Sequence, residues 1–217
     1  MNKLLRHPLA WPVALLLCLA PLAWLVWRAV MNQLGANPAE ALLRSTGVWT
    51  LRFLWVTLAV TPLRLWLQWP ALLRFRRLLG VTTFGYALLH FLAYAWLDMG
   101  FDLDAIVRDI PKRPFALVGF AALMLLVPLA ATSFNRAIRW LGAPRWQRLH
   151  KLVYVIAPLG LLHFFWIRAS KHRWPEVALY AALLVLIWSA RWWLKRRGPP
   201  ARGGAAGLAK VRPQSGQ

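Results

Sequence analysis

Acidic residues are scarce in this sequence, which has 6 Asp and Glu against 27 Lys and Arg among 217 residues. Hydrophobic residues make up 60%, which leaves too little polar surface for folding alone in water. The single cysteine, Cys18, excludes a disulfide framework. No glycine-rich phosphate loop follows a strand pattern, which excludes a Rossmann-type nicotinamide site. What remains is an all-α integral membrane protein.

Long apolar runs account for most of the chain. A membrane-spanning helix needs about 20 apolar residues, and on this basis the sequence predicts six spans. Their approximate ranges are Leu9 to Trp27, Val48 to Leu67, Leu78 to Leu97, Phe115 to Ala131, Leu152 to Ile167 and Val177 to Trp193. We expect the first to be a retained helix, because its apolar stretch is longer than that of a typical cleaved signal.

Charge is distributed unevenly between the predicted loops. Placing the N-terminus in the cytoplasm assigns 18 of the 27 basic residues to the inner side and all six acidic residues to the outer loops or their edges. The membrane therefore explains the net charge of +21, and we expect no nucleic-acid binding, because the aromatic residues lie in or beside the spans. Both termini are predicted to be cytoplasmic, and the Gly-, Ala- and Pro-rich segment from Gly198 is predicted to be a disordered tail.

Three histidines lie inside or at the edge of predicted spans: His90, His150 and His163. A buried imidazole is costly without a partner, and haem iron is the partner that paired intramembrane histidines favour. His90 lies 12 residues beyond Leu78 and His163 lies 12 beyond Lys151, so both imidazoles are roughly 18 Å from the inner boundary. This match predicts one haem between the third and fifth helices. The alternative for any single histidine is a hydrogen bond to a neighbouring helix.

His150 lies at the inner end of the fifth helix, roughly 20 Å from His163. It is either a ligand of a second, inner cofactor or a solvated residue at the helix end. Arginines crowd the same inner loops and suit a flavin phosphate or haem propionates, although positive-inside topology alone also explains them. Those that we predict to contact a cofactor are Arg76, Arg77 and Arg148. Arg52, within the second span, is expected either to extend its charge outward or to meet a propionate.

Several motifs occur in order at spacings typical of one known family. They are TPLR (residues 61–64), RRLLG (76–80), YALLH (86–90), KRPF (112–115), PLAATS (128–133), RLHKLVY (148–154) and HFFW (163–166). Between about Thr46 and Trp193 the chain resembles the MsrQ (YedZ) family, which comprises haem-binding membrane subunits of bacterial methionine sulfoxide reductase systems. The resemblance implies a six-helix bundle of ferric-reductase-like type that binds one or two haems b. A departure from the wider pattern is Arg76, which stands 14 residues before His90, where a second histidine is expected.

The resemblance also implies partners and a division of the chain. It implies FMN as a further cofactor, a quinol or a cytoplasmic flavin reductase as electron donor, and the periplasmic molybdenum enzyme MsrP as acceptor. The chain would then be an inner-membrane electron-transfer subunit, with sulfoxide reduction on its partner. The predicted units are residues 1–45 (first helix and outer loop), 46–194 (haem-binding core) and 195–217 (basic tail). Two other classes remain open: a cytochrome b subunit of another quinone-linked enzyme, and a cofactor-free membrane protein.

Overall fold

The structure is a computed structural model that describes residues 2–169 and 172–196. Over this part of the chain it contains helices and no strands. In chain order these are α1 (Asn2–Arg6), α2 (Ala10–Val30), α3 (Pro38–Leu67), η1 (Pro70–Leu72), α4 (Leu73–Leu97), α5 (Leu103–Lys112), α6 (Pro114–Ala131), α7 (Asn135–Leu141), α8 (Ala143–His150), α9 (Val153–Ala169) and α10 (Trp174–Arg196). The predicted tail, apart from Lys195 and Arg196, lies outside the described residues.

Six segments of the described chain are long and apolar enough to cross a membrane, which confirms the predicted number. The ranges differ most at α3, which begins at Pro38, ten residues before the predicted start of the second span. The Asn37 side chain accepts a hydrogen bond from the Glu40 N–H, and Pro38 occupies the first turn, so the helix starts on capping residues in a polar stretch. Hydropathy alone does not locate such a start. Residue 46, where the predicted core begins, lies within α3.

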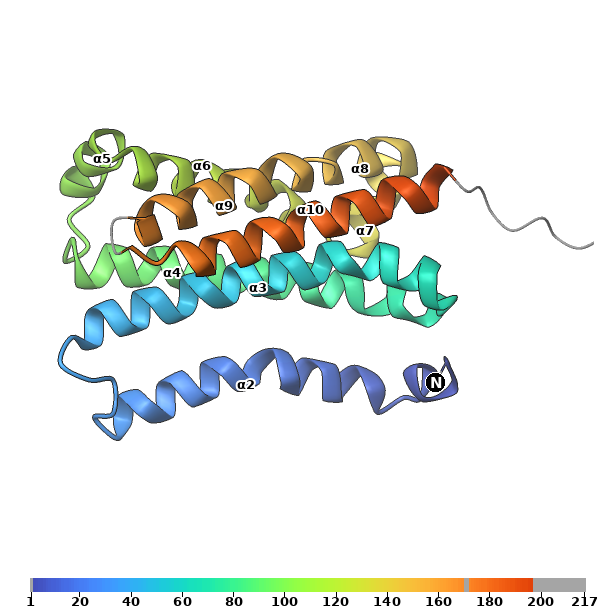
Figure 1. Cartoon of the computed structure of the whole chain (residues 1–217), viewed down its shortest axis with the longest axis horizontal. Coiled ribbons are helices and arrows are strands. Elements are labelled where there is room, and N and C mark those ends of the chain that lie inside the picture. The colour runs from blue at the N-terminus through green and yellow to red at the C-terminus, as the bar shows by residue number, and fades with distance from the viewer. Residues whose placement is uncertain (1, 170–171, 197–217) are drawn as a thin grey trace, which may run out of the picture.

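Five of the long helices share one apolar core. Buried side chains of α3, α4, α6, α9 and α10 form a single cluster, with Ile156 and Ala157 of α9 almost completely enclosed. In Figure 1, α6 and α9 run along one side of the bundle, and α3 and α4 run along the other. α2 packs on the outside of α3 and α4 through Cys18, Phe53 and Tyr86, and the Tyr86 hydroxyl donates to the Cys18 carbonyl at 2.9 Å.

The two ends of the bundle differ in their charged residues. The N-terminus and the last turn of α10 lie at the same end (Figure 1), together with η1, α7 and α8, and we call this the basic end. The other end holds the α2–α3 connection, α5 and the start of α10, together with all six acidic residues, and we call it the acidic end. α5 packs there through Ile106 and Ile110 against Ala95 of α4. The charge asymmetry predicted from the loops is therefore a property of the folded bundle.

Candidate functional site

A cavity of about 670 Å³ opens inside the half of the bundle nearer the acidic end. Its walls come mainly from apolar side chains of α3, α4, α6 and α9, and its volume is in the usual range for a bound small molecule. His90 of α4 and His163 of α9 both line it. We call it the outer cavity.

The two histidines predicted to pair from their depth lie opposite each other. Their ring centres are 5.9 Å apart and their planes are inclined by 76°. They are 73 residues apart in sequence and come from different helices, α4 and α9, which both run from the basic end to the acidic end (Figure 1), so the packing of the bundle brings them together. The structure thus brings together the two residues that the depth match paired, and their role as haem ligands stays a prediction.

Each imidazole is oriented by a hydrogen bond to the backbone of a neighbouring helix. His90 Nδ1 lies 3.0 Å from the Leu43 carbonyl oxygen of α3, and His163 Nδ1 lies 2.7 Å from the Phe115 carbonyl oxygen of α6. A carbonyl only accepts, so Nδ1 carries the proton in each ring and Nε2 keeps its lone pair. Metal-binding histidines are held in this way, because the second ring nitrogen sets the tautomer and the ring direction.

Two glycines allow the rings to pack directly against the helix backbone. A Cβ atom on Gly47 of α3 would stand 3.0 Å from Cε1 of His90, and one on Gly119 of α6 would stand 2.6 Å from Nδ1 of His163. Sequence analysis did not identify either residue. The available signal was an isolated glycine in an apolar helix pattern, which indicates close backbone approach but does not say to what.

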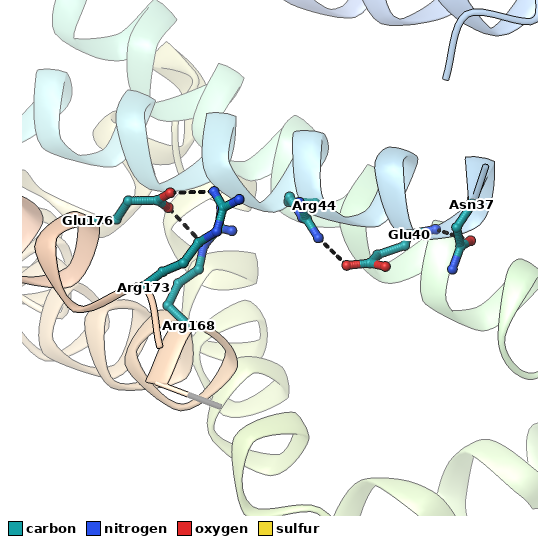
Figure 2. A network of polar contacts seen from close by, with 6 residues as sticks. All are labelled: Asn37, Glu40, Arg44, Arg168, Arg173 and Glu176. Atoms are coloured by element: carbon teal, nitrogen blue, oxygen red, sulfur yellow. Dashed lines mark hydrogen bonds and ion pairs between the residues drawn. The ribbon is translucent and has the colours of Figure 1, made fainter. Parts of the chain in front are cut away.

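Arginines at the acidic end also line the outer cavity, and sequence analysis did not identify them as site residues. They are Arg44, Arg113 and Arg168. Arg44 pairs with Glu40, Arg113 Nε lies 2.9 Å from Asp109 Oδ1, and Arg168 Nε lies 3.1 Å from Glu176 Oε2. Figure 2 shows that Arg168 and Arg173 converge on the same Glu176 carboxylate.

Arg52 does not line the outer cavity, so the prediction that it meets a cofactor there is not supported by its position. Its Nε donates to the Tyr180 hydroxyl at 3.1 Å, and its guanidinium lies 4.7 Å from the Trp49 ring centre. Arg52 is instead exposed on the outside of the bundle, where aromatic neighbours stabilise its charge.

A second, smaller cavity of about 300 Å³ lies toward the basic end, and we call it the inner cavity. His150, Arg76 and Arg77 line it, as predicted for an inner cofactor, whereas Arg148 is exposed and does not. The His150 ring stacks on Trp146 with centres 4.0 Å apart. No second histidine of the described chain lines this cavity. Arg76, which stands where the wider family pattern has a histidine, lines it instead. Leu54 and Leu126 line both cavities.

A six-helix membrane bundle with two facing intramembrane imidazoles is the architecture of a ferric-reductase-like electron-transfer domain. The model of the family "Ferric reductase like transmembrane component" matches residues 46–161, which include α4 with His90 and end just before His163. Within this class, the chain belongs to the MsrQ family.

Curated relatives match over nearly the whole chain, and each carries the name "Protein-methionine-sulfoxide reductase heme-binding subunit MsrQ". A relative from Polaromonas naphthalenivorans is 57% identical over 210 residues, covering 95% of this chain and 96% of its own. One from Ralstonia nicotianae is 50% identical, covering 88% and 87%, and one from Caulobacter vibrioides is 45% identical, covering 89% and 91%. No solved structure gave a significant match.

We predict that Gly119→Ala destabilises the protein although alanine favours a helix by about 1 kcal/mol. The new methyl group would overlap the His163 ring, and such overpacking typically costs about 1–3 kcal/mol. Thermal unfolding in detergent measures the effect. The matched control is Gly85→Ala, because nothing lies within 4 Å of a Cβ at that helical position. Equal melting temperatures for the two variants would show that the His163 ring does not require a glycine at position 119.

Proposed function

We propose that this chain is an electron-transfer subunit that holds haem b between His90 and His163. The observation that carries the proposal is the pair of facing imidazoles, each with Nδ1 on a backbone carbonyl and Nε2 available. The relatives' printed name, a heme-binding subunit, supports the same cofactor. When bound, the haem supplies reversible one-electron transfer.

The residues present suit this cofactor. Two imidazoles that bind one metal ion have ring centres roughly 6 Å apart, because each metal–nitrogen bond is about 2 Å long, and the observed separation is 5.9 Å. The neutral tautomer set by Leu43 and Phe115 is the one that binds iron. Apolar side chains form most of the cavity wall, and such surroundings tune the redox potential of a bound metal group.

The orientation of the bundle follows from its charge. We place the basic end, with the N-terminus and the last turn of α10, in the cytoplasm and the acidic end in the periplasm, as the positive-inside rule requires for an inner-membrane protein. The histidine pair then lies in the outer half of the membrane. Electrons enter from the cytoplasmic side, from quinol or a flavin reductase, and leave toward the periplasm.

The inner cavity is the best-supported place for a second cofactor. Arg76 and Arg77 present guanidinium groups suited to a phosphate, which supports the FMN predicted from the resemblance. An inner haem would have His150 as its only histidine among the described cavity residues. Leu54 and Leu126 line both cavities, so the two candidate cofactor sites are neighbours within the bundle.

The acceptor in this proposal is the periplasmic methionine sulfoxide reductase MsrP. The relatives' name describes a heme-binding subunit of a methionine sulfoxide reductase, which supports a separate partner for the sulfoxide chemistry. The sulfoxide is therefore reduced on the partner, which serves repair of oxidised periplasmic proteins. Family membership and the paired histidines favour this reading over a cofactor-free membrane protein.

We predict that the reduced-minus-oxidised absorption spectrum of the detergent-purified protein shows b-type haem bands. His90→Ala and His163→Ala should lose the outer haem, because each removes one of its two ligands, whereas His150→Ala should keep those bands. His7→Ala, in an exposed position, is the matched control. Absence of haem bands from the parent protein, or their full retention in His163→Ala, would contradict the proposal.

A C-terminal fusion tests the orientation. With the basic end in the cytoplasm, green fluorescent protein fused after residue 217 should fluoresce and alkaline phosphatase fused there should be inactive. A fusion in the α4–α5 connection at the acidic end, near Gly100, should give the reverse pattern. Active phosphatase at the C-terminus would show that the orientation is inverted.

We predict that the purified chain alone does not reduce methionine sulfoxide, even with a chemical electron donor present. Sulfoxide reduction should appear when an MsrP protein is added, and the haem of the reduced chain should then reoxidise. Stopped-flow absorption at the haem bands and product assay measure the two events. Sulfoxide reduction by the chain without a partner would contradict the proposal that the partner carries out this reaction.

A further inference from the structure

The acidic-end wall of the outer cavity contains two arginines from different helices, Arg44 of α3 and Arg168 of α9. Figure 2 shows both in neighbouring polar groups: Arg168 with Arg173 on Glu176, and Arg44 on Glu40. Arg168 is only 5% exposed, although it is a charged residue near the end of a membrane-spanning helix. A buried guanidinium is costly unless several of its five N–H groups are bonded, so its position calls for an explanation.

One explanation is purely structural. Arg168 Nε bonds Glu176, and its guanidinium lies 5.2 Å from the Phe164 ring centre, so it joins α9 to the start of α10. A link of this kind does not need the guanidinium to line a cavity, and Arg173 makes a comparable bond to Glu176 from an exposed position outside it. What distinguishes Arg168 and Arg44 from Arg173 is that both line the outer cavity.

Both arginines lie a short distance outside the histidine pair. Arg168 is five residues beyond His163 on α9, which places its backbone roughly 7.5 Å nearer the acidic end. Arg44 directly follows Leu43, whose carbonyl holds His90, and precedes Gly47 by one turn. Two guanidinium groups from different helices thus line the outer cavity on the acidic-end side of the histidines.

Arg113 also lines this cavity, but its side chain already takes part in a polar link between α5 and α4. Its partner Asp109 accepts a 2.8 Å hydrogen bond from the Tyr94 hydroxyl as well, so the three side chains form a closed link between α4 and the chain before α6. By contrast, the carboxylate of Glu176 is shared by Arg168 and Arg173. Arg173 can keep Glu176 paired when Arg168 bonds another anion.

We propose that Arg44 and Arg168 form the binding site for the two carboxylates of the haem held by His90 and His163, an inference that rests on the proposed function. Guanidinium groups bind carboxylates through charge-assisted, often bidentate hydrogen bonds. Glu40 and Glu176 orient the arginines in the absence of these carboxylates and give up part of that bonding to them. The two carboxylates of the haem would then face the acidic end. This contact would determine how the haem is rotated within the outer cavity.

The test compares the rate at which haem and haem dimethyl ester, whose acids are capped, are lost to an acceptor protein such as apomyoglobin. Both cofactors are loaded into the full-length chain in detergent. Arg168→Gln and Arg44→Gln should each release haem roughly tenfold faster than the parent, as expected for loss of one charge-assisted hydrogen bond. The dimethyl ester should leave the parent and both variants at similar rates.

Arg173→Gln is the matched control, because it removes an arginine from the same carboxylate but not from the cavity, and its haem release should stay within about twofold of the parent. Arg168→Gln also removes one of the two partners of Glu176, and this loss could prevent folding. In that case the double variant Arg168→Gln/Glu176→Gln replaces it and should show the same rapid haem release. Haem that binds through the histidines yet leaves all variants at the parent rate would overturn the arginine site alone. A parent protein without haem would overturn the proposed function as well.

Discussion

The cost of placing an imidazole in a membrane interior constrains the rest of this structure. The cost is offset only if one ring nitrogen of each imidazole forms a hydrogen bond and the other also binds a partner. The bundle meets the first requirement with backbone carbonyls of Leu43 and Phe115, which come from helices that carry neither histidine. α3 and α6 must therefore lie at fixed depth and close distance to α4 and α9. Gly47 and Gly119 permit that distance.

The outer cavity and the inner cavity differ in ways that follow from the same packing. The outer one has paired imidazoles, apolar walls and a border of arginines at the acidic end, whereas the inner one is smaller and combines a single histidine with Arg76 and Arg77. Arg76 lines the inner cavity, and its guanidinium suits an anion and cannot bind a metal ion. The bundle is thus asymmetric along the membrane normal in its cavities as well as in its surface charge.

Much of this arrangement was predictable from the sequence, because membrane-spanning helices impose simple rules. Hydropathy gave the number of spans, loop charges gave the two ends, and a rise of 1.5 Å per residue gave the matched depth of His90 and His163. The start of α3 was misplaced, since it depends on a capping asparagine and a proline and not on apolar residues. The division into units, the FMN and the donor stay predictions.

The contacts that the sequence did not reveal all involve lateral neighbours, which depth does not determine. Gly119 matters because the His163 ring packs against it, and Arg168 matters because it lines the outer cavity. The residue spacing along one helix does not reveal such contacts with other helices. Arg52 was considered for a cofactor contact because it lies within a span, yet helix rotation directs it to Tyr180 outside the cavity. Arg148 likewise lies on α8, two residues before His150, but is exposed and does not line the inner cavity.

The most direct test of the central claim, that His90 and His163 together bind one haem iron, is the electron paramagnetic resonance spectrum of the oxidised, detergent-purified protein. Two neutral imidazoles held as close as 5.9 Å between ring centres would both bind the iron and give a low-spin ferric signal. This signal should vanish in His163→Ala. A high-spin ferric signal from the parent protein, which indicates an iron without two imidazole ligands, would contradict the account.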